Sequence, residues 1–244
     1  MSEKKSTNRF IWGLAVAFLL PLSFYFIAKT LSKDKIFMPG HYGIDRVDSA
    51  AADGKVVRDT IYHTTSDLAL TNQLGDKITL NETLQGKILV VDFFFANCMG
   101  TCPKLSGNMA LLQKAFRHNP KMENGLDNSV QFVSITIDPA HDSFPELRKY
   151  ADRYGANHDH WWFLTGDKKD IYNFARNELK LSVGPGDGGA EDFIHTEKMV
   201  LIDAKRNIRG YYDGLDTAQI KKCADDIVLL TMEKEHKRKI PGSK

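Results

Sequence analysis

Two cysteines, Cys98 and Cys102, lie close together in the segment FFFANCMGTCP. The apolar residues before them are typical of a buried strand, and Pro103 suits the first position of a helix. The start of a helix carries partial positive charge and free N–H groups, and both favour thiolate over thiol. Because the thiolate binds metals and attacks disulfides, the sequence predicts a metal site or a redox-active dithiol here.

The spacing of this pair helps to separate the two kinds of site. Thioredoxin-type oxidoreductases use C-x-x-C, whereas three residues separate Cys98 from Cys102. Residues four apart at the start of a helix can share one face, so the two sulfurs can form a clamp. Two thiolates select copper(I) or zinc over hard ions. The alternative is a pair of small buried side chains at a strand end, because cysteine is often buried.

A third ligand has to come from elsewhere in the chain. Structural zinc sites usually take four ligands, and the one remaining cysteine, Cys223, lies among apolar residues of a predicted helix. Among the eight histidines, His195 precedes the last predicted hairpin in DFIHTEKMVLID. We expect that hairpin to begin beside the cysteines, but a lone histidine before a strand is more often structural. His158 and His160 have ligand-like spacing, yet they lie in a polar segment that is predicted to be a surface loop.

The predicted elements place the cysteine pair at a junction between a strand and a helix. Residues 87–95, KILVVDFFF, form a near-continuous apolar run, which is typical of a central strand covered on both faces. Further strands are expected over residues 68–72, 77–80, 130–138, 161–166 and 198–214, the last as a hairpin, and helices over 103–118, 144–156, 170–179 and 217–237. This alternation, with a closing hairpin and helix, indicates a three-layer α/β domain of thioredoxin-like order over residues 63–240.

The N-terminal segment is predicted to anchor the protein in a membrane. Residues 10–28, FIWGLAVAFLLPLSFYFIA, carry no charge and would form a helix about 28 Å long, close to the hydrocarbon thickness of a bilayer. A cleaved signal peptide is the alternative, but the following KTLSKDKIF offers no small-residue cleavage site. We therefore expect a tail over residues 1–9, a single transmembrane helix over 10–28 and a linker over 29–62.

Charge and composition limit where the protein can be located and which partners it can bind. Three basic residues lie on each side of the apolar run, so the charge count does not orient it. Because an N-terminal anchor commonly acts as an uncleaved signal, we expect the short tail inside and the domain outside. The nine-residue tail is too short for an Arg-rich transit peptide, which favours a bacterial inner-membrane protein whose domain faces the periplasm or the cell exterior. The net charge of +2 on 244 residues gives no general attraction to nucleic acid, so no such partner is expected. Three cysteines are too few for a disulfide framework.

Four segments together resemble a known family. They read GKILVVDFFFANC with a following CP, VSITIDPAHDSFPELRKYADRYGA, LTGDKKDI and FIHTEKMVLIDAKRNIRGYYDG, and they occur in this order between residues 67 and 213. In these pieces and in its N-terminal anchor, the chain resembles the Sco (SenC-type) copper-delivery proteins of cytochrome c oxidase assembly. The resemblance implies a thioredoxin-like fold.

The resemblance also implies a set of site residues. It makes Cys98, Cys102 and His195 the ligands of a copper ion. Asp138 and Asp142 match a D-P-x-x-D segment near the metal loop, where they would support the site without touching the metal; for Asp138, a turn residue at a strand end is the alternative. The family often has proline and an acidic residue between the cysteines, whereas this chain has Met-Gly-Thr.

Three functions remain open on these observations. The first is a copper chaperone that delivers the ion to the copper site of cytochrome c oxidase subunit II. The second is a thiol–disulfide reductase that keeps the acceptor's cysteines reduced; it would use Cys98 and Cys102 catalytically but would not need His195. The third is a copper or redox sensor. Enzymatic activity is expected only in the second case.

Overall fold

The computed structural model describes residues 3–31, 38–52, 55–117, 129–181 and 196–233, which fall into two units, 1–37 and 38–244. The first unit holds helix α1 (Glu3–Leu31), with Pro21 inside it. Among the described residues, no helix combines the length and the hydropathy required to cross a membrane. The transmembrane helix over residues 10–28 therefore stays a prediction.

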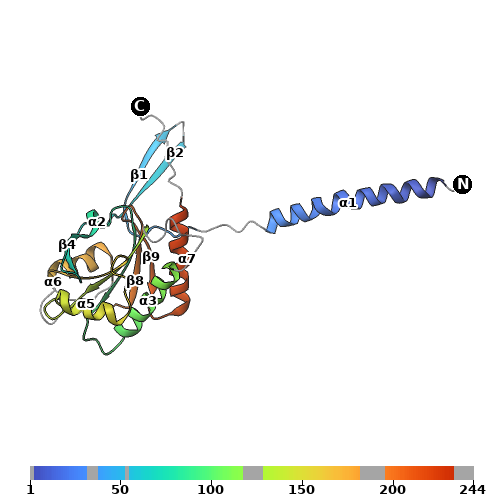
Figure 1. The fold of residues 1–244 in the computed structure, drawn as a ribbon. Helices are drawn as coiled ribbons and strands as arrows, with labels where there is room; N and C mark the ends of the chain where they lie inside the picture. The colour runs from blue at the N-terminus through green and yellow to red at the C-terminus, as the bar shows by residue number, and fades with distance from the viewer. Residues whose placement is uncertain (1–2, 32–37, 53–54, 118–128, 182–195, 234–244) are drawn as a thin grey trace. The chain divides into compact units, whose positions relative to one another are not determined.

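The second unit is built on a seven-stranded sheet with the order β4-β3-β7-β6-β5-β8-β9 (Figure 1). Its strands are β3 (Ala69–Asn72), β4 (Lys77–Thr79), β5 (Ile88–Phe94), β6 (Val130–Thr136), β7 (Trp161–Thr165), β8 (Lys198–Ile202) and β9 (Ile208–Asp213). Strand β5 pairs in parallel with β6 and antiparallel with β8, and every one of its residues is buried. This confirms the central strand that the apolar run predicted.

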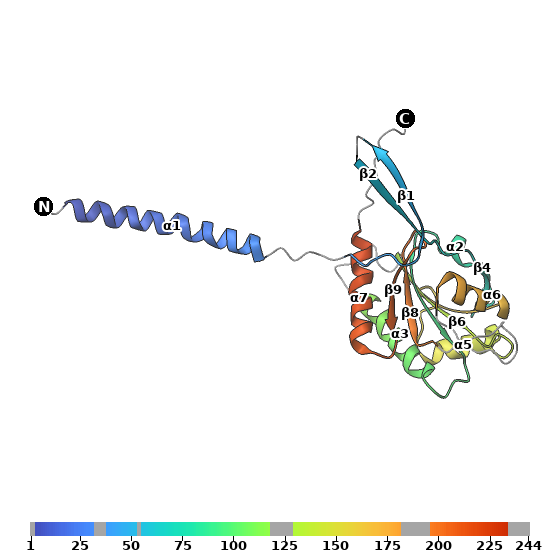
Figure 2. The same ribbon diagram turned by 180° about the vertical axis from the view of Figure 1, so that it is seen from behind.

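Helices cover both faces of this sheet (Figures 1 and 2). They are α2 (Leu80–Thr83), α3 (Cys102–Arg117), α5 (Phe144–Arg153), α6 (Lys168–Asn173), which continues into the π-helical turn η2 (Phe174–Glu178), and α7 (Thr217–Met232). One core cluster joins Val90 of β5 to α3, α5 and α7, and the other joins Leu89 to α2, α6 and η2. Because successive strand residues point to opposite faces, β5 contributes to both cores. The three-layer thioredoxin-like fold is confirmed.

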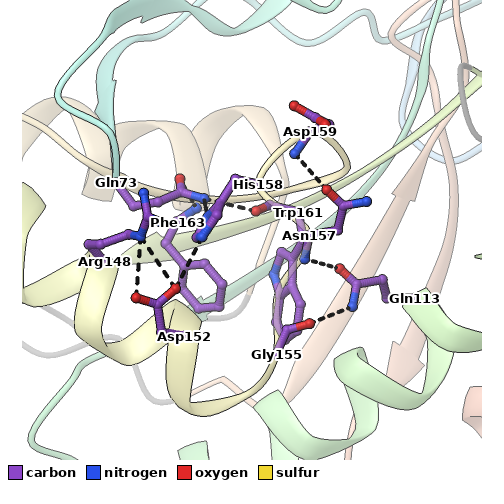
Figure 3. A network of polar contacts seen from close by, with 10 residues as sticks. All are labelled: Gln73, Gln113, Arg148, Asp152, Gly155, Asn157, His158, Asp159, Trp161 and Phe163. Carbon is purple, nitrogen blue, oxygen red and sulfur yellow. Dashed lines mark hydrogen bonds and ion pairs between the residues drawn. The ribbon is translucent and has the colours of Figure 1, made fainter.

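A polar network connects the residue after β3 to α5 (Figure 3). The Gln73 side chain, just after β3, donates to Trp161 O at 3.0 Å and accepts from Phe163 N at 3.0 Å. His158 contacts Gln73 Nε2 through Nδ1 at 2.9 Å and Asp152 Oδ1 through Nε2 at 3.1 Å. Both ring nitrogens of His158 thus have protein partners, which fits a structural role for this histidine.

The segment predicted as a linker contains a two-stranded antiparallel sheet. Strands β1 (Ile44–Ala52) and β2 (Lys55–Tyr62) pair with each other along almost their whole length. Their sequences, IDRVDSAAA and KVVRDTIY, lack a regular apolar alternation, and Ile44 and Val47 are exposed. Because neither sequence has a two-residue hydrophobic period, the sequence did not predict these strands.

Candidate metal centre

The cysteine pair lies in the connection from β5 to α3. Cys98 is in an irregular loop, and its N–H donates to Phe95 O at 3.2 Å. Thr101 O accepts from the N–H groups of Lys104 and Leu105, both at 3.0 Å, so the first turn of α3 closes on Thr101. Cys102 is then the first residue of α3. The predicted strand-to-helix junction is confirmed.

The two cysteine side chains are neighbours at different depths. Cys102 is only 7% exposed and belongs to the core cluster under α3, whereas Cys98 is half-buried and packs against that cluster. Both are free thiols, and the Cys98 side chain lies close enough to Cys102 to raise the pKa of its thiol. Cys223 lies fully buried on α7, in the core, as the sequence predicted. The structure therefore brings together the two sulfurs of the predicted clamp.

A cavity of about 430 Å³ opens at this pair. It is lined by Phe93, Phe94, Phe95, Cys98, Met99, Gly100, Thr101, Cys102, Ile137, Thr196 and Glu197. The last two residues lead into β8, so the start of the closing hairpin lies beside the cysteines, as expected. His195 itself lies outside the described residues, but the residue that follows it, Thr196, forms part of the cavity wall.

Close packing at Gly214 ties the start of β8 to α3. The Gly214 N–H donates to Glu197 O at 2.7 Å, and Asn108 of α3 donates to Gly214 O at 2.6 Å. A Cβ atom added to Gly214 would lie 2.1 Å from Leu105 Cδ1 and 2.9 Å from Glu197 O, so only glycine fits there. These contacts hold Glu197, two residues after His195, against the helix that begins with Cys102.

Burial dominates the acidity of Cys102. Burial and, to a smaller extent, the neighbouring Cys98 raise the pKa of this thiol to about 12, although a backbone hydrogen bond from Phe95 opposes the increase. The sequence predicted that the helix start would favour the thiolate. For Cys102 that prediction is wrong, because the cost of desolvating a buried thiolate exceeds the benefit of the helix start. A metal ion bound here would have to displace the thiol proton.

Asp142 supports the cysteine loop from behind. Its side chain is buried, and Oδ2 accepts from the Ala96 N–H at 3.0 Å and from Thr136 Oγ1 at 2.5 Å. Burial raises the pKa of Asp142, and these two hydrogen bonds act in the opposite direction. The carboxylate thus holds the backbone two residues before Cys98, a position consistent with the supporting role that the resemblance implied.

Asp138 occupies a turn at the end of β6. Its backbone carbonyl accepts from the N–H groups of His141 and Asp142 at 3.1 and 2.9 Å, and its two carboxylate oxygens contact His141 Nδ1 at 3.0 Å. This contact raises the pKa of the exposed His141. The Asp138 N–H donates to Thr136 Oγ1 of β6 at 3.0 Å, whereas the hydrogen bonds of its carboxylate among the described residues stay within this turn, as expected of a turn residue at a strand end.

The family model for SCO1/SenC matches residues 58–230, which include the whole cysteine junction. The chain belongs to the SCO1/SenC family.

Solved structures of other family members share this fold. A SCO1/SenC family lipoprotein from Bacillus anthracis str. Ames is 29% identical, with 69% of this chain and 95% of that chain covered and a TM-score of 0.59. BsSco, a member of the Sco family of cytochrome c oxidase assembly proteins with an identified disulfide switch, is 28% identical, with 70% and 95% covered and a TM-score of 0.58. ScoI of Bradyrhizobium japonicum, solved with copper bound, is 20% identical, with 68% and 99% covered and a TM-score of 0.53, a likeness of fold.

This SCO1/SenC chain also has a buried acid that the sequence reasoning missed. Asp92 of β5 is fully buried, its Oδ1 accepts from Ser134 Oγ at 2.5 Å, and that hydroxyl accepts from Trp161 Nε1 at 2.9 Å. Among the described residues, Asp92 Oδ2 has no hydrogen-bond partner. Burial raises the pKa of Asp92 to about 7, and its charge in turn contributes to the raised pKa of Cys102. The signal was visible, since Asp92 interrupts the apolar run KILVVDFFF.

Proposed function

We propose that this protein is a copper chaperone of cytochrome c oxidase assembly, which binds a copper ion through Cys98, Cys102 and His195. The observation that carries the proposal is the pair of neighbouring cysteine side chains at a cavity whose wall continues to Thr196, next to His195. Membership of the SCO1/SenC family supports it, as does the copper bound to the family member ScoI. The acceptor is the copper site of subunit II.

The ligand set suits transfer as well as binding. Two thiolates and an imidazole are soft to borderline donors, which favour copper(I) over hard ions. Three ligands leave room for a ligand from the acceptor, so the ion moves by ligand exchange while its charge stays +1. Binding releases the thiol protons, and copper retention therefore weakens as the pH falls.

The N-terminal segment is part of the same proposal. Residues 10–28 anchor the protein in the bacterial inner membrane and leave residues 38–244 on the periplasmic side. The uncharged run in the sequence supports this, and one solved relative is itself a lipoprotein. Anchoring holds the carrier at the membrane in which the oxidase is assembled.

Copper analysis of the reduced, full-length chain tests the proposal. Wild type is expected to retain one equivalent of copper(I) after desalting, and Cys98→Ser, Cys102→Ser and His195→Ala each to retain it at least about tenfold less tightly. Cys223→Ala, which removes the core thiol on α7, is the matched control and should retain copper. A wild-type chain that takes up no copper under reducing conditions would overturn the proposal.

Thiol–disulfide exchange is a second candidate, favoured by the contact between the two thiols and by the disulfide switch of BsSco. In that reaction Cys98 and Cys102 lose two electrons and two protons and form a disulfide, while an acceptor disulfide is reduced to two thiols. The same variants separate the candidates. A reductase loses activity in both cysteine variants and keeps it in His195→Ala, whereas the copper carrier fails in all three.

A further inference from the structure

The loop between the two cysteines exposes a methionine to solvent. The Met99 side chain is 99% exposed, the highest value among the large hydrophobic side chains of the described residues. Methionine normally stabilises a fold by burying its apolar side chain. Met99 buries almost none of its side chain and so gives no such stabilisation. It nevertheless forms part of the wall of the cysteine cavity. Packing in the core therefore does not explain why a methionine occupies this position.

Three sulfur-containing residues line this one cavity, and their exposure to solvent differs in steps. Met99 is 99% exposed, Cys98 is half-buried and Cys102 is 7% exposed. An ion that arrives from solvent, or from a donor protein, consequently meets the thioether and the outer thiol before the inner one. The same order applies in reverse to an ion that leaves.

The chemistry of the outer pair suits copper(I). A thioether is a soft ligand, and it binds copper(I) without losing a proton. Adjacent Cα atoms lie about 3.8 Å apart and methionine has three rotatable side-chain bonds, so the Met99 sulfur can reach an ion held by Cys98. A Cβ atom added to Gly100 would meet only Cys98 Sγ, at 3.9 Å, so the next residue leaves the loop room to move.

We propose that Met99 and Cys98 form a first-contact site for copper(I), through which the ion reaches and leaves the final ligands. Cys98 loses its thiol proton to water when the ion binds, and Cys102 loses a second proton when its sulfur displaces the thioether. Copper stays in the +1 state throughout, and release to an acceptor reverses these exchanges. This inference rests on the proposed copper carriage and adds a residue that controls its rate.

The test compares Met99→Leu with wild type, both as full-length chains loaded with copper(I) under anaerobic, reducing conditions. Leucine keeps the apolar side chain and removes only the thioether. Capture of the ion by bathocuproine disulfonate is expected to slow at least about fivefold in Met99→Leu, because the exchange barrier rises. Copper held at equilibrium should change by less than about twofold, since the final ligands remain. Met232→Leu, at an exposed methionine on α7, is the matched control and should leave both quantities unchanged.

A second measurement observes the thioether directly. In a Cys102→Ser chain, where no inner sulfur can displace the thioether, labelled with ¹³C at the methionine methyl groups, less than one equivalent of copper(I) should shift or broaden the Met99 signal and leave the Met232 signal in place. Wild-type transfer rates in Met99→Leu, or an unmoved Met99 signal while copper binds, would overturn the inference alone. A loss of more than about tenfold in equilibrium retention would also overturn it, because Met99 would then be a permanent ligand. A wild-type chain that holds no copper would overturn the proposed function as well.

Discussion

Asp92 is a buried acid that weakens the fold once it ionises. Its second carboxylate oxygen has no partner among the described residues, and no salt bridge to it is found there. A single hydrogen bond offsets only a small part of the free energy that is lost when a buried carboxyl group becomes charged away from water. Its pKa of about 7, above the ordinary value of 3.8, expresses that cost.

The stability of the protein should therefore depend on pH through this residue. Between pH 4 and pH 7 the folded state keeps the Asp92 proton and the unfolded state loses it, so stability falls as pH rises through this window. Asp92→Asn cannot ionise, and its free energy of unfolding relative to wild type should improve by roughly 2–3 kcal/mol between pH 5 and pH 8. Urea denaturation at the two pH values measures this.

The matched control for that comparison is Asp225→Asn, at an exposed acid on α7. It should shift the free energy of unfolding by the same small amount at both pH values. The unpaired amide nitrogen that Asp92→Asn introduces costs stability equally at each pH, so only the difference between the two measurements bears on Asp92. A difference of zero would mean that Asp92 is already ionised without penalty at pH 5.

At the residue scale, the sequence predicted which side chains meet but not their acidity. The spacing of Cys98 and Cys102 and the flanking strand and helix were enough to place the two sulfurs together. The pKa of Cys102 is raised because the first residue of α3 is buried in the core. How deeply a residue is buried depends on the tertiary structure, which the local sequence does not determine. Asp92 was overlooked because a single acid leaves the apolar pattern of the strand recognisable.

The turn after β6 holds the cysteine loop, and Asp142 is its point of attachment. Removing this carboxylate leaves the Ala96 N–H without its acceptor and frees the backbone just before Cys98. We expect Asp142→Ala to lower copper affinity by about 10- to 100-fold, as is typical when a group that orients metal ligands is lost. Competition with a copper(I) chelator at equilibrium gives this affinity.

Asp138→Ala serves as the comparison, because the carboxylate that it removes bonds only to His141, in its own turn, among the described residues. It removes the same charge four residues earlier in the chain and should cost less affinity than Asp142→Ala. If the larger loss follows from Asp138→Ala, then Asp138 acts on the site in the copper-bound state and the loop attachment is secondary.

At the element scale, burial decided which strands the sequence could reveal. Strands β5, β6 and β7 are covered on both faces, and their apolar runs predicted them with nearly correct limits. Strands β1 and β2 have no apolar period, so the same reasoning placed a linker there. The sheet of β1 and β2 is formed by backbone hydrogen bonds, and these produce no recognisable pattern of residue types in the sequence.

At the scale of the whole molecule, the site depends on segments far apart in the chain. Antiparallel pairing of β5 with β8, with Val91 opposite Val200, returns the chain to the cysteine junction. The resemblance to a family predicted this return, whereas hydrophobic periodicity could not, because it carries no information on strand order. Contacts at Gly214 then set the start of β8 against α3.

The anchor can be tested at the same scale, because residues 38–244 form a compact unit of their own. The full-length chain is expected to stay with the membrane fraction after washing with high salt. A truncated chain that begins at Met38 should appear in the soluble fraction and still retain copper, since both cysteines and His195 remain. Leu19→Lys combined with Leu20→Lys should also release the full-length chain, because each lysine at the centre of a membrane helix costs about 2.5–3.5 kcal/mol. Leu19→Ala with Leu20→Ala controls for the loss of leucine and should stay bound, and wild type in the soluble fraction would exclude the anchor.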